Sequence, residues 1–258
     1  MTSQPLAGRR ILVTRGASQA PKLSEGLRAL GANPIEVPVL EIRPPASYES
    51  LDAALRNLDS YDWLILTSAN AVRAIAERAS HLGISLDRQA SLEVAAVGPA
   101  TASEAKKGGL AVSLMPETYI AEGMIDLLQT RAHRRRVLIV RAAVARDVIP
   151  NALREAGATV DVVDAYRNVL PDAAPEQLRR AVAERIDAAT FTSSSSATHL
   201  AEAARLAGIA FPLADVSAVS IGPITSETLR EIGWLPAAEA SPHDIEGLIA
   251  AATELLAR

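Results

Sequence analysis

Short apolar runs alternate with longer segments of helical periodicity along nearly the whole chain. The extended runs lie at 10–14, 34–39, 62–66, 92–97, 111–115, 136–140, 188–191 and 216–221. Most are followed by segments whose apolar residues recur three or four positions apart, which is typical of amphipathic helices. Glycines close two of these segments, at Gly31 and Gly157. The alternation predicts right-handed βαβ connections, and hence an α/β protein of parallel sheets flanked by helices.

The two halves of the chain repeat this order of elements. Equivalent residues recur at nearly constant offsets: Gly31 and Gly157 are 126 positions apart, Asp62 and Asp187 are 125 apart, and Gly98, Glu122 and Gly123 precede Gly222, Glu246 and Gly247 by 124. Two copies of one unit therefore account for nearly the whole chain. At the position equivalent to Tyr166, the first copy has Leu40. A break in a repeat is where function can be added, so Tyr166 becomes a candidate.

The stretch 157–171, GATVDVVDAYRNVLP, begins as an apolar strand, carries Tyr166 and ends at Pro171. This pattern is typical of a connection that leaves one packed unit and enters another. The matching run in the first copy continues to Pro44-Pro45 and is longer than one strand needs. We expect these two segments to join a pair of lobes, with Tyr166 facing the cleft between them.

The composition limits the classes of function. Of 258 residues, 49% are hydrophobic and 22% charged, which is ordinary for a globular protein, whereas only 3% are aromatic. The absence of cysteine excludes disulfides, thiolate metal sites and a cysteine nucleophile. A net charge of −4 argues against a general nucleic-acid-binding protein. Because no apolar leader or membrane-length run is present, we expect a cytoplasmic protein.

Polar residues cluster where the expected strands end, and parallel sheets bind ligands at that edge. The candidates are Arg15, Ser68, Asn70, Gly98, Thr101, Arg141, Ser193, Ser194, Ser195 and Thr225. Two interpretations stay open for the hydroxyl and Gly-Pro positions. They cap helices and form turns, or they bind carboxylate or phosphate groups through hydroxyls and helix N-terminal N–H groups. Arg15 and Arg141, equivalent in the two copies, favour an anionic ligand.

Metal and nucleotide sites receive little support from the sequence. The four histidines are scattered and show no i,i+4 pairs: His81, His133, His199 and His243. No glycine-rich phosphate loop or dinucleotide fingerprint follows a strand. Glu122 and Glu246 fall in the first turn of a helix, where a carboxylate interacts favourably with the helix dipole, so we expect structural roles. The run Arg134–Arg136 is interpreted as a solvated flank at the opposite edge.

The motifs of both copies together resemble one known family. The segments ILVTR, GANPIEVPVLEI, YDWLILTSANAV, AAVGPAT and AEGM, followed by GATVDVVDAYR, ATFTSSS, SIGPITSE and IEGL, are similar in order and spacing to uroporphyrinogen-III synthases of the tetrapyrrole pathway. The resemblance extends from Arg9 to Leu256. Two positions depart from the family pattern: Ala71 replaces a common glycine, and Ile120 replaces a frequent hydroxyl residue.

The resemblance implies a fold and a domain division. Members of that family have two flavodoxin-like lobes, each a parallel sheet flanked by helices, joined by two extended linkers. The first βαβ of each copy packs with the remainder of the other copy. Carried over, residues 1–39 and 168–258 form one discontinuous lobe, and residues 40–167 form the second. Sequential halves would show the same periodicity, so the sequence leaves both arrangements open.

The resemblance also implies a reaction. Family members cyclise hydroxymethylbilane, an open tetrapyrrole with eight carboxylates, with loss of water and inversion of ring D, to give uroporphyrinogen III. Departure of the hydroxyl gives an azafulvene-like cation, and attack from ring D gives a spiro intermediate. Tyr166 matches the family's linker tyrosine, proposed to help the hydroxyl leave. The alternative is that its ring packs and its hydroxyl is hydrated. The candidates at the strand ends are expected to bind substrate.

The implied enzyme is a lyase of porphyrin and heme biosynthesis that needs no metal or organic cofactor. Its partner is the small-molecule substrate, with hand-over from hydroxymethylbilane synthase. We expect a monomer that binds neither nucleic acid nor membrane. The main alternative is a non-catalytic tetrapyrrole- or anion-binding module on the same fold, against which Tyr166 argues. A two-lobed solute-binding protein would be expected to carry a secretion signal.

Overall fold

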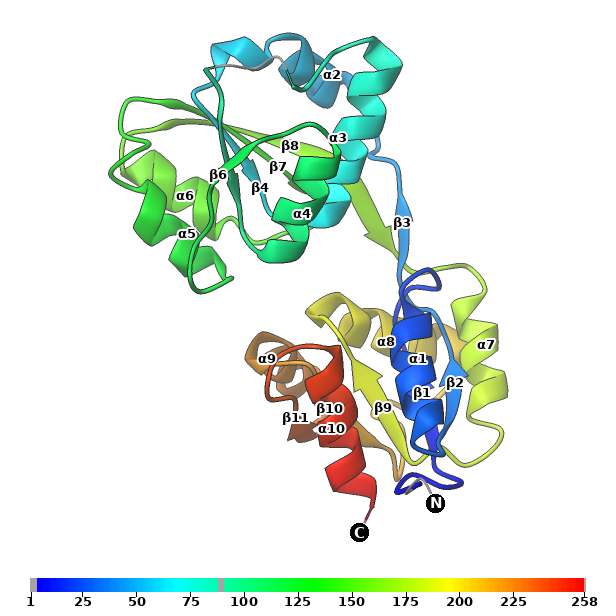
Figure 1. Ribbon diagram of the computed structural model, residues 1–258. Helices are drawn as coiled ribbons and strands as arrows, with labels where there is room; N and C mark the ends of the chain where they lie inside the picture. Colours follow the sequence, from blue (N-terminus) through cyan, green and yellow to red (C-terminus); the bar gives the residue numbers. More distant parts are fainter. Residues whose placement is uncertain (1–3, 88–90, 258) are drawn as a thin grey trace. The chain divides into compact units, whose positions relative to one another are not determined.

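The structure, a computed structural model, describes residues 4–87 and 91–257 (Figure 1). The chain folds into two compact units. Unit 1 comprises Met1–Glu41 and Val169–Arg258, and unit 2 comprises Ile42–Asn168. Unit 1 is therefore assembled from both ends of the chain, whereas unit 2 is one continuous segment.

Unit 1 contains a five-stranded sheet with helices on both faces (Figure 1). In sheet order the strands are β11 (Pro236–Glu239), β10 (Ser217–Ser220), β9 (Ala188–Phe191), β1 (Arg10–Val13) and β2 (Asn33–Glu36). All neighbouring pairs are parallel. One face is covered by α1 (Ala20–Ala29) and α10 (Ile245–Leu256). The other is covered by α7 (Ala174–Ala181), α8 (Ser194–Ala207) and α9 (Pro223–Glu231).

Unit 2 is built around a six-stranded sheet of the same design. Its order is β3 (Glu41–Arg43), β8 (Thr159–Val169), β7 (Arg136–Ala142), β4 (Trp63–Leu66), β5 (Glu93–Ala96) and β6 (Val112–Leu114), parallel from β8 to β6. On one face lie α2 (Glu49–Arg56), the short 3-10 helix η1 (Leu58–Ser60), α3 (Ala69–Leu82) and α4 (Pro99–Lys107). On the other lie α5 (Ala121–Leu128) and α6 (Val148–Glu155).

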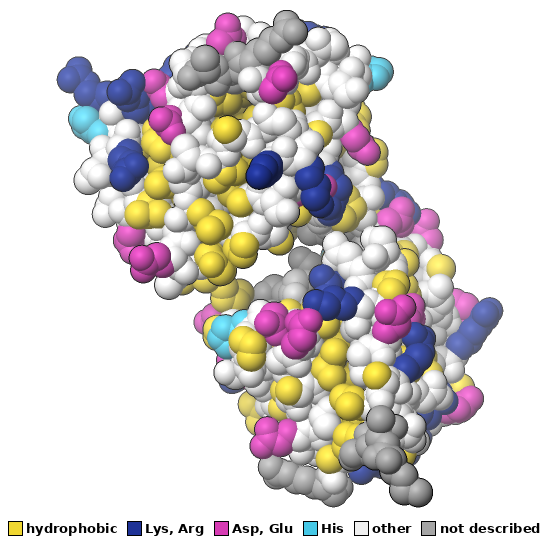
Figure 2. All heavy atoms as spheres, viewed as in Figure 1, with side chains coloured by type: hydrophobic (Ala, Val, Ile, Leu, Met, Phe, Trp, Pro, Cys, Tyr) yellow, Lys and Arg dark blue, Asp and Glu magenta, His cyan; other side chains and the backbone are white. Residues whose placement is uncertain are grey.

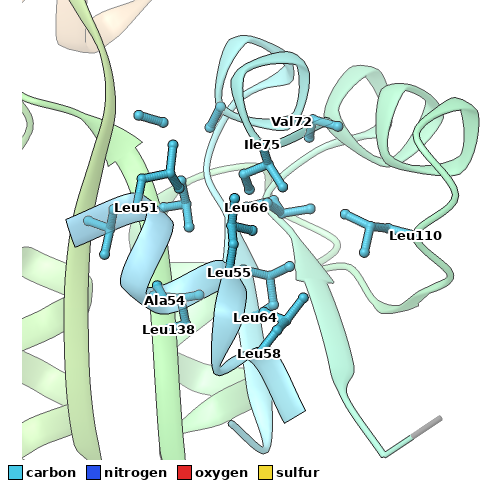
Figure 3. Packing of buried hydrophobic residues seen from close by; sticks show 14 of the residues in the cluster. Leu51, Ala54, Leu55, Leu58, Leu64, Leu66, Val72, Ile75, Leu110 and Leu138 are labelled. Carbon is cyan, nitrogen blue, oxygen red and sulfur yellow. The ribbon is translucent and has the colours of Figure 1, made fainter. Parts of the chain in front are cut away.

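The short apolar runs form strands because each sheet is covered on both faces. Side chains alternate along a strand, so neighbours point to opposite faces. On β4, Leu64 and Leu66 pack with Leu55 and Ile75 of the helices on one face (Figure 3). Ile65, between them, packs in the cluster beneath α5 and α6. A strand buried on both faces must be apolar throughout, which is the pattern the sequence shows.

The connection at 157–171 is more regular than a linker. β8 extends over Thr159–Val169 and is hydrogen-bonded to β7 on one side and β3 on the other. In addition, Arg167 donates from Nε to the carbonyl oxygen of Pro44 at 2.9 Å. The two extended segments that connect the units therefore lie side by side and bind each other.

Two aspartates join strands that come from different halves of the sequence. Asp187, beside β9, accepts a hydrogen bond from the backbone N–H of Arg10 at 2.9 Å. Asp62, beside β4, accepts one from the backbone N–H of Arg136 at 2.8 Å and another from the Arg135 guanidinium at 2.9 Å. Arg135 and Arg136 are exposed, as expected for a solvated flank, but they also anchor the start of β7.

Tyr61 is a buried tyrosine at the amino-terminal edge of the unit 2 sheet. Its side chain is 7% exposed, and its hydroxyl donates to Asp161 Oδ2 at 2.8 Å. The Arg136 guanidinium lies 4.8 Å from the ring centre. Burial, together with the hydrogen bond to the Asp161 carboxylate, raises the pKa of Tyr61 to about 12.

This raised pKa predicts a stability loss in strong base. The unfolded phenol titrates near pH 10, whereas the folded one keeps its proton to about pH 12. The stabilisation from Tyr61 is thus complete below about pH 10 and lost as the pH rises to about 12. In urea titrations across this range, the unfolding free energy of Tyr61→Phe should fall less steeply than that of the wild type. Parallel slopes would contradict the assignment.

Candidate active site

Tyr166 and Ser68 meet at the carboxyl ends of the unit 2 strands. Tyr166 lies near the end of β8 and Ser68 follows β4, with β7 between the two strands. Their hydroxyl oxygens are 3.0 Å apart, and the Tyr166 side chain is only 6% exposed. Sequence analysis selected both residues, but it did not predict that they contact each other.

A β-bulge determines the direction of the Tyr166 side chain. The register of β7 and β8 is regular up to the pair of Arg141 with Asp164, but the next pair is Ala142 with Tyr166. One extra residue, Ala165, is inserted between them. In an uninterrupted strand Tyr166 would share a face with the exposed Asp164. The bulge instead lets Tyr166 join the buried cluster beneath α2 and α3.

The hydroxyl of Ser68 is also held by a hydrogen bond from the backbone of α3. Ser68 is the N-cap of α3, and its Oγ accepts a hydrogen bond from the Ala71 N–H at 3.1 Å. A serine hydroxyl has one proton and two lone pairs, so Ser68 can still donate its proton to Tyr166 Oη. In that arrangement Tyr166 has its own proton available for a ligand. The pair can therefore act as a hydrogen-bond or proton donor.

The other unit 2 candidates lie in the first turns of helices at the same edge. Asn70 is in the first turn of α3, where its side-chain oxygen accepts from Arg73. Gly98 is the N-cap of α4, and Thr101, in its first turn, is only 6% exposed. The first N–H groups of a helix have no intrahelical acceptor. These turns therefore offer backbone donors, whereas the Thr101 hydroxyl is buried.

Arg141 is placed at the end of β7, one position before the residue that pairs with Tyr166. Its side chain is 12% exposed and forms an ion pair with Asp147, with Nη2 and Oδ1 2.6 Å apart. Nη1 also donates to the carbonyl oxygen of Arg146 at 3.1 Å. A cation therefore lies at the predicted edge of the sheet, but a carboxylate of the chain already contacts it.

The unit 1 candidates occupy the corresponding edge of the other sheet. Arg15 follows β1 and donates from Nε to Gln19 Oε1 at 3.1 Å. Its partial burial lowers the pKa of Arg15 from the usual value for a guanidinium. Thr225, in the first turn of α9, is only 4% exposed. Arg15 thus places a cation at this edge, whereas the Thr225 side chain in α9 is buried.

The serine turn of unit 1 begins α8. Ser193 is the N-cap and forms a capping box with Ser196. Ser194 accepts a hydrogen bond from the Thr228 hydroxyl at 2.8 Å. Ser195 lies in the first turn of α8 and is half-buried. The capping interpretation therefore holds for Ser193, and it does not exclude binding by the adjacent N–H groups.

Comparison with known proteins identifies the family of this chain. The family model described as uroporphyrinogen-III synthase HemD matches residues 21–250. A uroporphyrinogen-III synthase of Synechococcus elongatus is 35% identical over 264 residues, which cover 97% of each chain. The chain belongs to the uroporphyrinogen-III synthase family. A porphyrin biosynthesis protein HemD of Ruminiclostridium josui is 30% identical over 88% of this chain and 45% of that protein.

A solved structure supports the fold of this uroporphyrinogen-III synthase family member. The crystal structure of a mutant uroporphyrinogen III synthase from Thermus thermophilus superposes with a TM-score of 0.70, at 22% identity, over 96% of this chain and 99% of that one. The expected family and the expected α/β fold of parallel sheets flanked by helices are both confirmed.

Sequence analysis missed two ring-bearing residues next to the Gly-Pro turns. Tyr119 lies beside Gly98, where an added Cβ would be 3.5 Å from the Tyr119 Cβ. His243 lies beside Gly222, where an added Cβ would be 3.3 Å from the imidazole. Tyr119 and His243 are 124 positions apart, the same offset as the two glycines. The repeat could have found them, since each lies three positions before the glutamate of a matched Glu-Gly pair, Glu122 and Glu246.

Within residues 4–87 and 91–257, no group of three His, Cys, Asp or Glu side chains could hold a metal ion. In the same ranges, no helix is long and apolar enough to span a membrane. The candidate residues of this uroporphyrinogen-III synthase family member supply hydroxyls, guanidinium groups and backbone amides at the strand ends.

Proposed function

We propose that this protein is a uroporphyrinogen-III synthase, a lyase that cyclises hydroxymethylbilane to uroporphyrinogen III with loss of water and inversion of ring D. The observation that carries the proposal is the contact between the buried Tyr166 hydroxyl and Ser68 at the carboxyl ends of the strands, in a chain of this family. The near full-length similarity to a uroporphyrinogen-III synthase supports it.

In the proposed first step, Tyr166 assists departure of the substrate hydroxyl. The C–O bond breaks, the Tyr166 proton goes to the leaving oxygen to form water, and the pyrrole nitrogen stabilises the resulting azafulvene-like cation. Ser68 donates to Tyr166 Oη and so stabilises the negative charge that develops there. Ring D then attacks, and the spiro intermediate fragments and closes again. When ring D closes again, its α-carbon forms the new C–C bond and loses its proton, which restores the pyrrole. This proton returns to Tyr166, so the net change is loss of one water.

The proposed binding groups match a polyanionic substrate. Helix N-termini favour carboxylates through free N–H groups and the helix dipole. We assign this role to the turns containing Ser68, Asn70, Gly98, Thr101, Ser193, Ser194, Ser195 and Thr225, with Arg15 and Arg141 as the cations. On the face shown in Figure 2, basic and acidic side chains are interspersed. Binding would therefore depend on these local groups rather than on a general positive surface.

We also propose the lobe boundaries, the cellular compartment and the oligomeric state of the enzyme. The lobes would be residues 1–39 with 168–258, and residues 40–167. The enzyme would act as a cytoplasmic monomer that receives the bilane from hydroxymethylbilane synthase.

The decisive experiment identifies the product isomer. Hydroxymethylbilane is generated in situ, the purified protein is added, and the product is oxidised so that the porphyrin isomers can be separated chromatographically. We expect predominantly type III isomer, because the uncatalysed reaction yields mainly type I. Type I product at the spontaneous rate, from protein whose circular dichroism shows it to be folded, would refute the proposal.

A further inference from the structure

The ion pair at the end of β7 has an uneven geometry. The Arg141 side chain is 12% exposed, whereas that of Asp147 is 60% exposed. The cation is thus part of the packed edge of the sheet, and the carboxylate reaches it from the solvent side. Ala142, the next residue of β7, pairs with Tyr166, which places this ion pair at the proposed site.

Asp147 satisfies the guanidinium only in part. A guanidinium binds a carboxylate most strongly when two N–H groups on one edge engage both oxygens. Asp147 contacts Nη2 through Oδ1. Arg141 Nε is buried and has no hydrogen-bond partner within the described part of the chain. The contact is therefore a single-point one, and weaker than a two-point contact would be.

The carboxylate of Asp147 is also not used for helix capping. Asp147 is the N-cap of α6, a position where aspartate normally accepts from a backbone N–H of the first turn. Here its side chain makes no such capping bond. Its position is thus explained by its contact with Arg141, and not by stabilisation of α6.

The other copy of the repeat treats its arginine differently. Arg15 is equivalent to Arg141, and it donates to the amide oxygen of Gln19. Arg15 is thus bound by the neutral amide of Gln19, whereas Arg141 is bound by the carboxylate of Asp147. Because Arg15 is held at its strand end without a carboxylate, the Asp147 carboxylate is not needed merely to hold Arg141 at the end of β7.

We infer that Asp147 is a built-in competitor for the carboxylate subsite at Arg141. In the free enzyme its carboxylate contacts the Arg141 guanidinium, and a substrate carboxylate must displace it to bind there. Asp147 therefore lowers the affinity of the enzyme for its polyanionic substrate. The inference rests on the proposed function and assigns a positioning and affinity-setting role to a residue that does not itself react.

Asp147→Asn tests this role because it keeps the size of the side chain and removes its charge. We expect the KM for hydroxymethylbilane to fall about two- to five-fold, the range for a partly exposed ion pair, with kcat unchanged. The converse variant, Gln19→Glu, places a carboxylate beside Arg15 and should raise KM. Binding of uroporphyrin III, an octacarboxylic probe followed by fluorescence, should become tighter in Asp147→Asn and weaker in Gln19→Glu.

Asp59→Asn is the matched control for general electrostatics. It removes the same charge from an exposed position of η1, which precedes β4 and so lies at the opposite edge of the sheet from Arg141. Equal falls in KM for Asp59→Asn and Asp147→Asn would show that only net charge matters and would overturn the inference, as would an unchanged KM in Asp147→Asn. If the wild type makes no type III isomer, the proposed function fails, and the uroporphyrin binding comparison still tests Asp147.

Discussion

Replacing Tyr166 with Phe should lower kcat for type III product by about 100-fold or more, the usual effect of losing a general acid. Phe retains the buried ring and removes only the hydroxyl 3.0 Å from Ser68. Because the hydroxyl is proposed to act as the C–O bond breaks, the loss should fall on kcat and leave KM nearly unchanged. The measurement is the initial rate of type III formation at several substrate concentrations.

Tyr61→Phe is the matched control for this variant. Tyr61 is a second buried tyrosine of unit 2 whose hydroxyl is hydrogen-bonded to Asp161, at the opposite edge of the sheet. The Tyr61→Phe variant should be less stable than the wild type and have the same kcat. The Tyr166→Phe variant should have a lower kcat and a melting temperature within a few degrees of that of the wild type. A wild-type kcat for Tyr166→Phe would remove the proposed chemical role of this hydroxyl.

Replacing Gly247 with Ala should destabilise unit 1 by about 3 kcal/mol or more, because the new methyl group has no space. A Cβ at this position would lie 1.9 Å from the carbonyl oxygen of Pro242. To relieve this clash the first turn of α10 must move, although the Gly247 N–H in that turn donates a hydrogen bond to Asp244 Oδ1 at 2.8 Å. The equivalent Gly123 has the same constraint, with a Cβ 2.4 Å from the carbonyl oxygen of Thr118. Urea unfolding measures the loss for both variants.

Gly108→Ala controls for the general effect of adding a methyl group to a glycine. A Cβ on Gly108 would meet its nearest neighbour, the carbonyl oxygen of Ala105, at 3.5 Å, which is an ordinary contact. Its φ of −79° is accessible to alanine. We expect a change of less than about 1 kcal/mol. Losses of similar size in Gly108→Ala and Gly247→Ala would contradict the close-packing explanation.

The fold was largely predictable because buried parallel strands have a distinctive pattern. Runs such as Trp63–Leu66 are apolar at every position, which only a strand covered on both faces requires. The helical segment that Gly31 closes begins at Ala20, several residues after the strand at 10–14, with a proline in its first turn. The repeat offsets located equivalent elements correctly, since they depend on spacing along the chain.

The contacts of the site could not be predicted in the same way. Ser68 and Tyr166 are 98 positions apart in the sequence. They come together because β4 and β8 are the two neighbours of β7 in the sheet, and because a bulge in β8 turns the Tyr166 side chain to the face where Ser68 lies. The sequence does not single out Asp147, because an aspartate before a helix is the usual N-cap, a role that its side chain does not fill here. Local patterns indicate which residues end a strand. They do not indicate which residues then touch across the sheet.

The hydrogen bond between Arg10 and Asp187 spans 177 positions and has a consequence for biosynthesis. Unit 2 is one uninterrupted segment, so it can assemble on the ribosome once its last strand emerges. The strands β1 and β2 are made before unit 2, yet β1 has its second neighbour only when β9 has been translated. Until then Leu12, fully buried in the finished molecule, lacks the helices α7, α8 and α9 that cover its face of the sheet. During this interval β1 has an open edge, and open strand edges are where a folding chain pairs with other chains.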